Sequence, residues 1–323
     1  MNQTKQPTNT GALATLVTVF FFWGFIAASN GIFIPFCKKF FNLTQFESQL
    51  IDTAFYGAYF IGSYILFLSA ALTKIDILNK IGYRKGIVLG LFISIAGAVL
   101  MIPAVNTGAF AFILGAFFVI ALGFSLQQTA AQPFAISLGD PSTGSHRLNL
   151  AGSVNSFGTT IGPLIVSVVL FGSIAEGAAS TADIGQIKFL YTIVAGVFFL
   201  ASLIFIFSKK LPDQSFEEHV ETSNKALVSL TLLVVALGAI GMLGQVTELS
   251  KLSLSGMAIA VVFVVLSLSY SFANKSGEGW GAMKYPQLIL GMFAIFTYVG
   301  VEVTIQSNMG ALLKLPSFGA IDE

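Results

Sequence analysis

Charged residues are scarce in this 323-residue chain. They occupy 10% of its positions, against about 25% in a typical soluble domain. Hydrophobic residues make up 55%, and the mean hydropathy is +0.85. A soluble protein of this composition would have too few polar side chains to cover its surface. We therefore expect lipid to be the main solvent of the folded chain, as in an integral membrane protein.

Cysteine and histidine are almost absent. The single cysteine, Cys37, excludes an intramolecular disulfide and a cysteine-based metal cluster. The two histidines, His146 and His219, are too few for a histidine-rich metal site. No Walker A loop, His-Glu-x-x-His motif or Gly-x-Ser-x-Gly elbow occurs. We expect no metal, no cofactor and no enzymatic activity, and the formal charge of +1 argues against a nucleic-acid partner.

Long apolar runs dominate the sequence. A membrane-spanning helix needs roughly 20 mainly apolar residues, and backbone polar groups in lipid must pair within the segment. Nine runs meet this requirement: 12–36, 50–72, 86–104, 109–138, 149–173, 187–208, 226–246, 253–273 and 287–313. The period-2 alternation of a membrane β-barrel is not seen in them. The predicted fold class is an all-α integral membrane bundle of about nine transmembrane helices.

Lysine and arginine concentrate in the loops that share one side with the N-terminus, which predicts a cytoplasmic N-terminus. Arg147 belongs to this set and precedes the fifth run. We expect its side chain either to snorkel to the interface or to pair with Asp140.

The most polar segment runs from Lys209 to Lys225 and follows the sixth apolar run. It predicts a solvated linker and divides the chain. We expect a six-helix half over residues 1–210, then a cytoplasmic linker with two inserted transmembrane helices over 211–285. Residues 286–323 would hold the first helix of a second half.

One carboxylate, that of Glu302, lies well inside an apolar run. A carboxylate near a helix centre costs roughly 2.5–3.5 kcal/mol on insertion scales. Its functional interpretation is a protonatable group that faces a cavity. The alternative is a structural partner for a Ser, Thr or Asn on a neighbouring helix. Ionisable groups inside the membrane are functional by default, so we favour the first interpretation.

The fourth run contains three glutamines, Gln127, Gln128 and Gln132, followed by Pro133. Gln128 and Gln132 are four positions apart and share a helix face. Their carboxamides offer donors and acceptors that suit sugar hydroxyls. Hydrogen bonding between helices, at about 0.6 kcal/mol per contact, explains them equally well. Pro133 is expected to kink the helix, and interrupted helices often line transporter sites.

Other polar candidates lie on the first and fifth runs. Trp23 and Asn30 belong to the first, and Asn149 and Asn155 to the fifth. Trp23 can stack on a sugar ring, although a packing or interfacial aromatic explains it slightly better. Together with the glutamines, these side chains predict a membrane protein that binds and moves a small polar solute.

Five ordered motifs resemble helices of the fucose permease and glucose/galactose transporter family, within the major facilitator superfamily. The motifs are 21–25 (FFWGF) with 30–35 (NGIFIP), 54–61 (AFYGAYFI), 126–134 (LQQTAAQPF), 147–158 (RLNLAGSVNSFG) and 298–303 (YVGVEV). The likeness spans most of 15–210 and 287–313. The two helices between about 226 and 273 fall outside it and resemble an insertion.

The resemblance implies a symporter that takes up a monosaccharide such as glucose, galactose or fucose with a proton, by alternating access. It also implies a bacterial inner membrane. Two acidic positions of the fucose type are lost, because Gly31 and Gln128 stand where fucose permeases carry Asp and Glu. Gln128 fits the glucose branch better. Gly152 and Gln132 also depart from the family's Gln and Asn. Glu302 is then the main candidate for proton coupling.

Family members have twelve helices, so this chain is expected to lack about five and not to transport efficiently by itself. Two alternatives stay open. The first is an exporter of drugs or other small solutes with the same architecture, which would need a more apolar cavity than three glutamines imply. The second is a truncated, non-transporting membrane scaffold or sensor. The sequence gives no oligomeric state.

Overall fold

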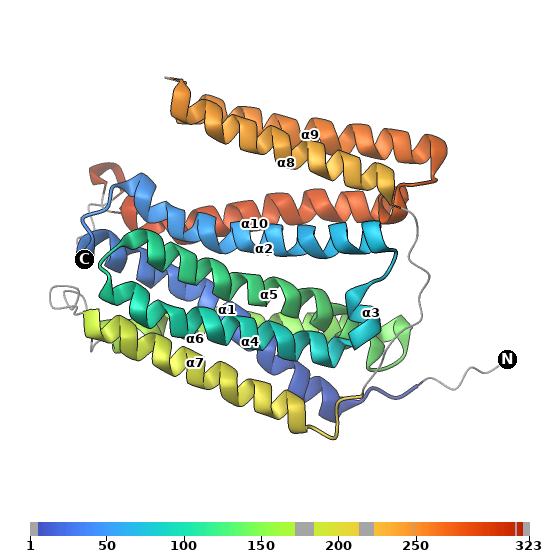
Figure 1. Ribbon diagram of the computed structural model, residues 1–323, viewed down its shortest axis with the longest axis horizontal. Coiled ribbons are helices and arrows are strands. Elements are labelled where there is room, and N and C mark those ends of the chain that lie inside the picture. Colours follow the sequence, from blue (N-terminus) through green and yellow to red (C-terminus); the bar gives the residue numbers. More distant parts are fainter. Residues whose placement is uncertain (1–5, 172–183, 213–222, 248, 314, 319–323) are drawn as a thin grey trace. The chain divides into compact units, whose positions relative to one another are not determined.

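The computed structural model describes residues 6–171, 184–212, 223–247, 249–313 and 315–318. Every regular element in these ranges is a helix (Figure 1). Nine of the described helices are long and apolar enough to cross a membrane, which confirms the predicted fold class. They are α1 (Thr10–Phe40), α2 (Gln45–Thr73), α4 (Tyr83–Asn106), α5 (Phe110–Ser137), α6 (Gly144–Phe171), α7 (Ile184–Phe207), α8 (Asn224–Val246), α9 (Lys251–Ser276) and α10 (Pro286–Leu313).

Four short elements complete the described part of the chain. They are α3 (Ile77–Ile81) and the 3-10 turns η1 (Pro141–Thr143), η3 (Gly281–Lys284) and η4 (Pro316–Phe318). The chain forms two compact units. Unit 1 comprises Met1–Tyr64, Leu78–Phe216 and Thr304–Glu323, and unit 2 comprises Ile65–Ile77 and Glu217–Val303. Most of the predicted polar linker, residues 213–222, lies outside the described residues, and the predicted domain boundaries stay a prediction.

In unit 1, α1 packs along α6, and α4 packs along α5 and α7 (Figure 1). Glycines make the first of these contacts possible. A Cβ on Gly24 would collide with the backbone carbonyl of Asn155, and one on Gly158 would collide with the carbonyl of Phe21. Small residues let membrane helices approach to backbone contact, where van der Waals packing replaces the missing hydrophobic effect.

Arg147 at the start of α6 holds the C-terminal end of α5. Its side chain is 3% exposed. Nε donates to the carbonyl of Ala135 at 2.8 Å, and Nη2 donates to those of Ile136 at 2.6 Å and Asp140 at 2.9 Å. The last carbonyls of a helix have no partner within the helix, and cations are favoured there. The snorkelling prediction is therefore wrong, and the bond to Asp140 goes to its backbone carbonyl.

A second arginine, Arg84, binds the last backbone carbonyls of α7 at the same end of unit 1. Arg84 Nε donates to the carbonyl of Phe205 at 2.8 Å, and Nη2 donates to that of Ile206 at 2.5 Å. The N-terminal segment joins this end as well, because the backbone N–H of Asn9 donates to the carbonyl of Leu138 at 2.8 Å.

The start of α2 is fixed by a capping box. The Glu47 N–H donates to Thr44 Oγ1 at 3.2 Å, and the Thr44 N–H donates to Glu47 Oε2 at 2.8 Å. This reciprocal pair satisfies two backbone donors that the helix itself cannot use. It places the helix start at Gln45, about five residues before the run predicted from hydropathy. Asp52 consequently lies two turns inside α2.

In unit 2, α8 and α9 form an antiparallel hairpin. A small cluster closes one end of it, where Trp280 packs against Ala226 and Ala273, with Phe67 and Met283 at its edge. Apart from this cluster, most of the large hydrophobic side chains of both helices are exposed. That pattern is typical of helices that face lipid.

Candidate functional site

The first polar contact in the span region joins α1 to α2. Asn30 is 4% exposed, and its Nδ2 donates to Asp52 Oδ1 at 3.3 Å. Asp52 itself is half-buried. Hydropathy placed Asp52 at the edge of a run, and it was therefore not among the predicted site residues. The Thr44–Glu47 spacing of a capping box was the signal that could have found it.

A second polar contact joins α2 to α5. Gln128 Nε2 donates to the Tyr59 hydroxyl at 3.2 Å, and the hydroxyls of Ser63 and Ser125 lie 3.1 Å apart. Gln128 is half-buried, whereas Gln132, one turn further along the same face, is exposed. The bond to Tyr59 uses the amide nitrogen, which leaves Gln128 Oε1 as an acceptor. The predicted pair therefore lies on an accessible face of α5.

Gln127 and Trp23, in contrast, belong to a buried network. Trp23 is 3% exposed and Gln127 is 1% exposed. Trp23 Nε1 donates to Gln127 Oε1 at 3.2 Å, and Gln127 Nε2 donates to Ser94 Oγ at 3.0 Å. Ser94 Oγ donates in turn to the carbonyl of Ile120. The network ties α1, α4 and α5 together, and it occupies polar atoms that a solute would need. This geometry favours a positioning role for both residues.

The two asparagines of α6 differ in their surroundings. Asn155 is half-buried, and its Nδ2 donates to the carbonyl of Phe20 at 2.9 Å across the α1–α6 contact. Asn149 is exposed near the start of the helix. The structure therefore uses Asn155 between helices and leaves Asn149 accessible.

Glu302 lies on α10 in unit 2 and is half-buried. It is hydrogen-bonded to Tyr298, one helical turn earlier on the same helix. A tyrosine hydroxyl can donate to a carboxylate. Unit 2 therefore carries a carboxyl group within a candidate span, with a neighbouring hydroxyl on the same helix.

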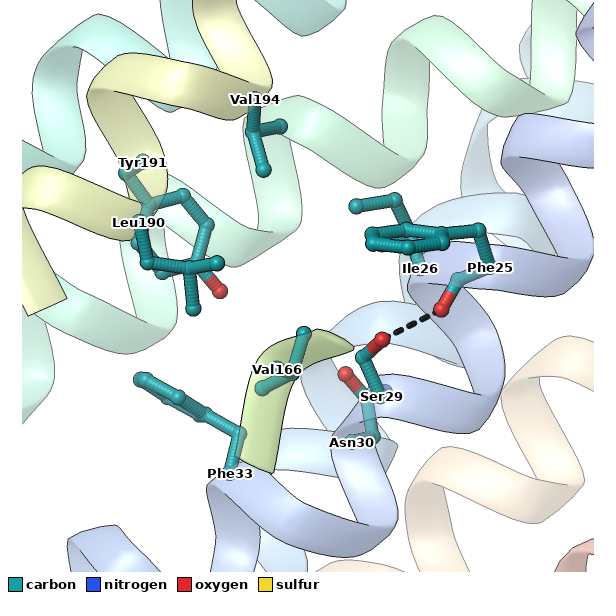
Figure 2. Close-up of a pocket in the computed structure, with 9 residues that line it drawn as sticks. All are labelled: Phe25, Ile26, Ser29, Asn30, Phe33, Val166, Leu190, Tyr191 and Val194. Carbon is teal, nitrogen blue, oxygen red and sulfur yellow. Dashed lines mark hydrogen bonds between the residues drawn. The ribbon is translucent and has the colours of Figure 1, made fainter. Parts of the chain in front are cut away.

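A small pocket in unit 1 lies between α1, α6 and α7 and has room for about one water molecule. Figure 2 shows its walls, which are mainly aromatic and aliphatic, with Ser29, Asn30 and Tyr191 as the polar residues. The Ser29 hydroxyl donates to the carbonyl of Phe25 at 2.5 Å and is occupied. The pocket has no lining residue from α5, so it is separate from the polar face that carries Gln128 and Gln132.

Comparisons with known proteins support the family resemblance. The glucose/galactose transporter of Brucella abortus biovar 1 is 31% identical over 322 residues, which are 99% of this chain and 63% of that protein. The putative glucose/galactose transporter of Helicobacter pylori is 36% identical over 230 residues, which are 70% of this chain and 54% of that protein. No protein-family model matches the chain.

Among solved structures, the crystal structure of the Escherichia coli fucose:proton symporter matches with a TM-score of 0.52 and 26% identity. The match covers 72% of this chain and 59% of that chain. It confirms the major facilitator-type helix bundle. This chain thus spans less than two thirds of the length of each of these relatives.

The alignment with the Brucella protein covers 99% of the chain and so includes α8 and α9. The match to the fucose:proton symporter covers 72%. The insertion of two helices between about 226 and 273 stays a prediction.

Proposed function

Because this chain is homologous to glucose/galactose transporters and to a fucose:proton symporter, we propose that it takes part in the proton-coupled uptake of a hexose. The observation that carries this proposal is the accessible glutamine face of α5. Gln128 and Gln132 lie one turn apart, and Gln128 is already hydrogen-bonded to a hydroxyl, that of Tyr59. A sugar hydroxyl can form the same kind of bond.

Within this proposal, Gln128, Gln132, Asn30 and Asn149 contact the sugar. Trp23, Gln127 and Asn155 hold α1, α4, α5 and α6 in the register that presents these contacts, through the hydrogen bonds described above.

We further propose a bacterial inner membrane and a cytoplasmic N-terminus. The polar end of unit 1, with Arg84, Arg147 and the N-terminal segment, would then face the cytoplasm. Labelling of a cysteine introduced at Ser142, an exposed position on η1, measures this. Reaction with a membrane-impermeant maleimide from outside intact cells would contradict the orientation. Cys37 is buried and gives little background.

Uptake by the complete protein in proteoliposomes tests the function. We expect an inward proton gradient to drive accumulation of radiolabelled D-glucose, D-galactose or L-fucose, and a protonophore to abolish it. The absence of gradient-dependent uptake for all three hexoses would contradict the proposal. A drug exporter of the same architecture is not favoured, because the relatives named above are sugar transporters and the α5 face is polar.

Glu302 is the proposed proton-coupling residue on α10. We expect Glu302→Gln to lose gradient-driven accumulation, because the amide keeps the shape but cannot exchange a proton at this position. Sugar exchange across the membrane without a gradient should partly persist, since it needs no net proton movement. Counterflow and accumulation measured on the same vesicles separate these effects.

Glu278→Gln provides a matched control, because Glu278 is an exposed carboxylate in the loop after α9. It should accumulate sugar like the unmodified protein. Normal accumulation in Glu302→Gln would remove Glu302 from the coupling mechanism while leaving the transport proposal intact.

A further inference from the structure

The fucose-type acidic position next to Asn30 is a glycine in this chain, Gly31, yet a carboxylate still contacts Asn30. It comes from α2. We propose that Asp52 is a proton-binding residue and that its protonation releases Asn30 to bind the transported sugar. This inference rests on the proposed hexose transport and adds a proton-linked switch of sugar affinity in the first half of the bundle.

The geometry places the pair inside the span region. Asp52 lies seven residues after the start of α2 at Gln45, or about 10 Å along the helix axis. Asn30 lies ten residues before the end of α1 at Phe40, or about 15 Å. Asp52 falls within the apolar candidate span of α2. An ionisable group inside a span is a functional candidate.

On the two helices of this contact, the other ionisable side chains lie at least one helical turn along the chain from Asn30 or Asp52. On α1, Lys38 and Lys39 lie in the last turn, two turns beyond Asn30. On α2 itself, Glu47 lies more than one turn earlier, and Tyr56 and Tyr59 follow one and two turns later. Of these residues, Tyr59 also contacts another helix, because its hydroxyl accepts a hydrogen bond from Gln128 of α5.

Two further helices reach α2 through hydrogen bonds. Gln49, three residues before Asp52, donates from Nε2 to Asn308 Oδ1 on α10 at 2.8 Å, and Gln128 of α5 contacts Tyr59. Neither α5 nor residues 304–313 of α10 carry an ionisable side chain. Asp52 is therefore the acidic group through which a proton can act on Asn30.

The switch follows from hydrogen-bond chemistry. An ionised carboxylate only accepts, and a bond from an amide to it is charge-assisted and strong. Asn30 Nδ2 makes such a bond in this structure. When an oxygen of Asp52 takes a proton from water, the carboxyl group becomes neutral and its pull on Nδ2 weakens. Asn30 also lines the small pocket in Figure 2. The released amide can donate to a sugar hydroxyl when the helices around this pocket separate during alternating access.

Protonation of Asp52 fixes the direction in which pH changes the affinity for sugar. Sugar should bind more tightly at low pH, where Asp52 is protonated and Asn30 is free. Loss of one hydrogen bond at high pH corresponds to a change on the order of tenfold in the dissociation constant. A proton therefore promotes loading, as symport requires.

Equilibrium binding of radiolabelled D-galactose to the complete purified protein, between pH 5.5 and pH 8, tests the proposal. We expect the dissociation constant of the unmodified protein to rise about tenfold over this range. In Asp52→Asn it should stay flat and near the low-pH value, because the side chain is neutral at every pH. Asp52→Glu keeps a titratable carboxyl group and should keep the pH dependence.

Glu47→Gln is the matched control. It neutralises an exposed carboxylate on the same helix, and glutamine preserves the capping box. Its pH profile should equal that of the unmodified protein. If Asp52→Asn does not fold, Asn30→Ala gives a second test, because it removes the released donor and should also flatten the profile.

Three outcomes would overturn the proposal. They are a pH-independent affinity in the unmodified protein, an unchanged profile in Asp52→Asn, or an affinity that responds to sodium at fixed pH and not to protons. In each case hexose binding is still observed, so the transport proposal survives. An absence of hexose binding at every pH contradicts the transport proposal itself.

Discussion

Replacing Arg147 by alanine is expected to destabilise unit 1 more than any other single loss of a side chain at this end of the bundle. The guanidinium group is buried and donates to three backbone carbonyls at the end of α5 and in the turn that follows. Hydrogen bonds to a charged group contribute about 1.5–3 kcal/mol each. A loss of several kcal/mol is comparable with the whole stability of many proteins.

The measurement is thermal unfolding of the purified protein in detergent, with yield and monodispersity by size-exclusion chromatography. Arg147→Lys should recover little, because one ammonium group cannot reach three carbonyls that a planar guanidinium group spans. His146→Ala is the matched control, since His146 is the exposed neighbour on the same helix, and it should leave the melting temperature unchanged. Equal melting temperatures of Arg147→Ala and the control would show that the Arg147 hydrogen bonds contribute nothing to stability.

The second large effect is expected for Gly158→Ala. A Cβ at this position would collide with the backbone carbonyl of Phe21 and approach the Phe25 nitrogen at 2.9 Å. Both atoms belong to the backbone of α1, so no side chain can move aside. The two helices would have to separate, and overpacking of this kind typically costs about 1–3 kcal/mol or more.

Gly152→Ala is the matched control for the contact between Gly158 and α1. Gly152 lies on the same helix and is exposed, and a Cβ there would meet nothing within 4 Å. Both variants gain the same helix propensity of roughly 1 kcal/mol. We expect Gly152→Ala to melt at or above the temperature of the unmodified protein and Gly158→Ala clearly below it. A Gly158→Ala protein as stable as Gly152→Ala would mean that α1 and α6 can separate freely.

The nine spans were predictable because lipid imposes one requirement on each of them, a length of apolar residues with internal backbone pairing. Their ends were less predictable. Hydropathy falls where polar residues enter a helix, but caps decide where the helix begins. At α2 the polar residues before position 50, Glu47 among them, hid the first five residues, although the capping box at Thr44 marked the start.

Residue type and spacing identified the polar side chains of the site, but not which of them are accessible. Gln127 and Gln128 are adjacent in sequence and point to different surroundings. Gln127 is enclosed by Trp23 and Ser94, whereas Gln128 lies on the accessible face with Gln132. Which helix packs on which face of α5 is set by tertiary contacts, such as the close approach of α4 and α5 at Gly90 and Gly123. No periodicity within a single run contains that information.

Arg147, hydrogen-bonded to the end of α5, and Arg84, hydrogen-bonded to the end of α7, act as two clamps. These two clamps form in a fixed order during synthesis. Arg147 follows Ala135 by only 12 residues, so this clamp can close as soon as the α5–α6 turn is made. Arg84 precedes Phe205 by 121 residues, and its partner carbonyls do not exist until α7 has been synthesised. Chains fold from the N-terminus as they are made, and distant contacts form late. Arg84 can therefore bind these carbonyls only after four helices have been synthesised, and this contact marks the completion of the first six spans.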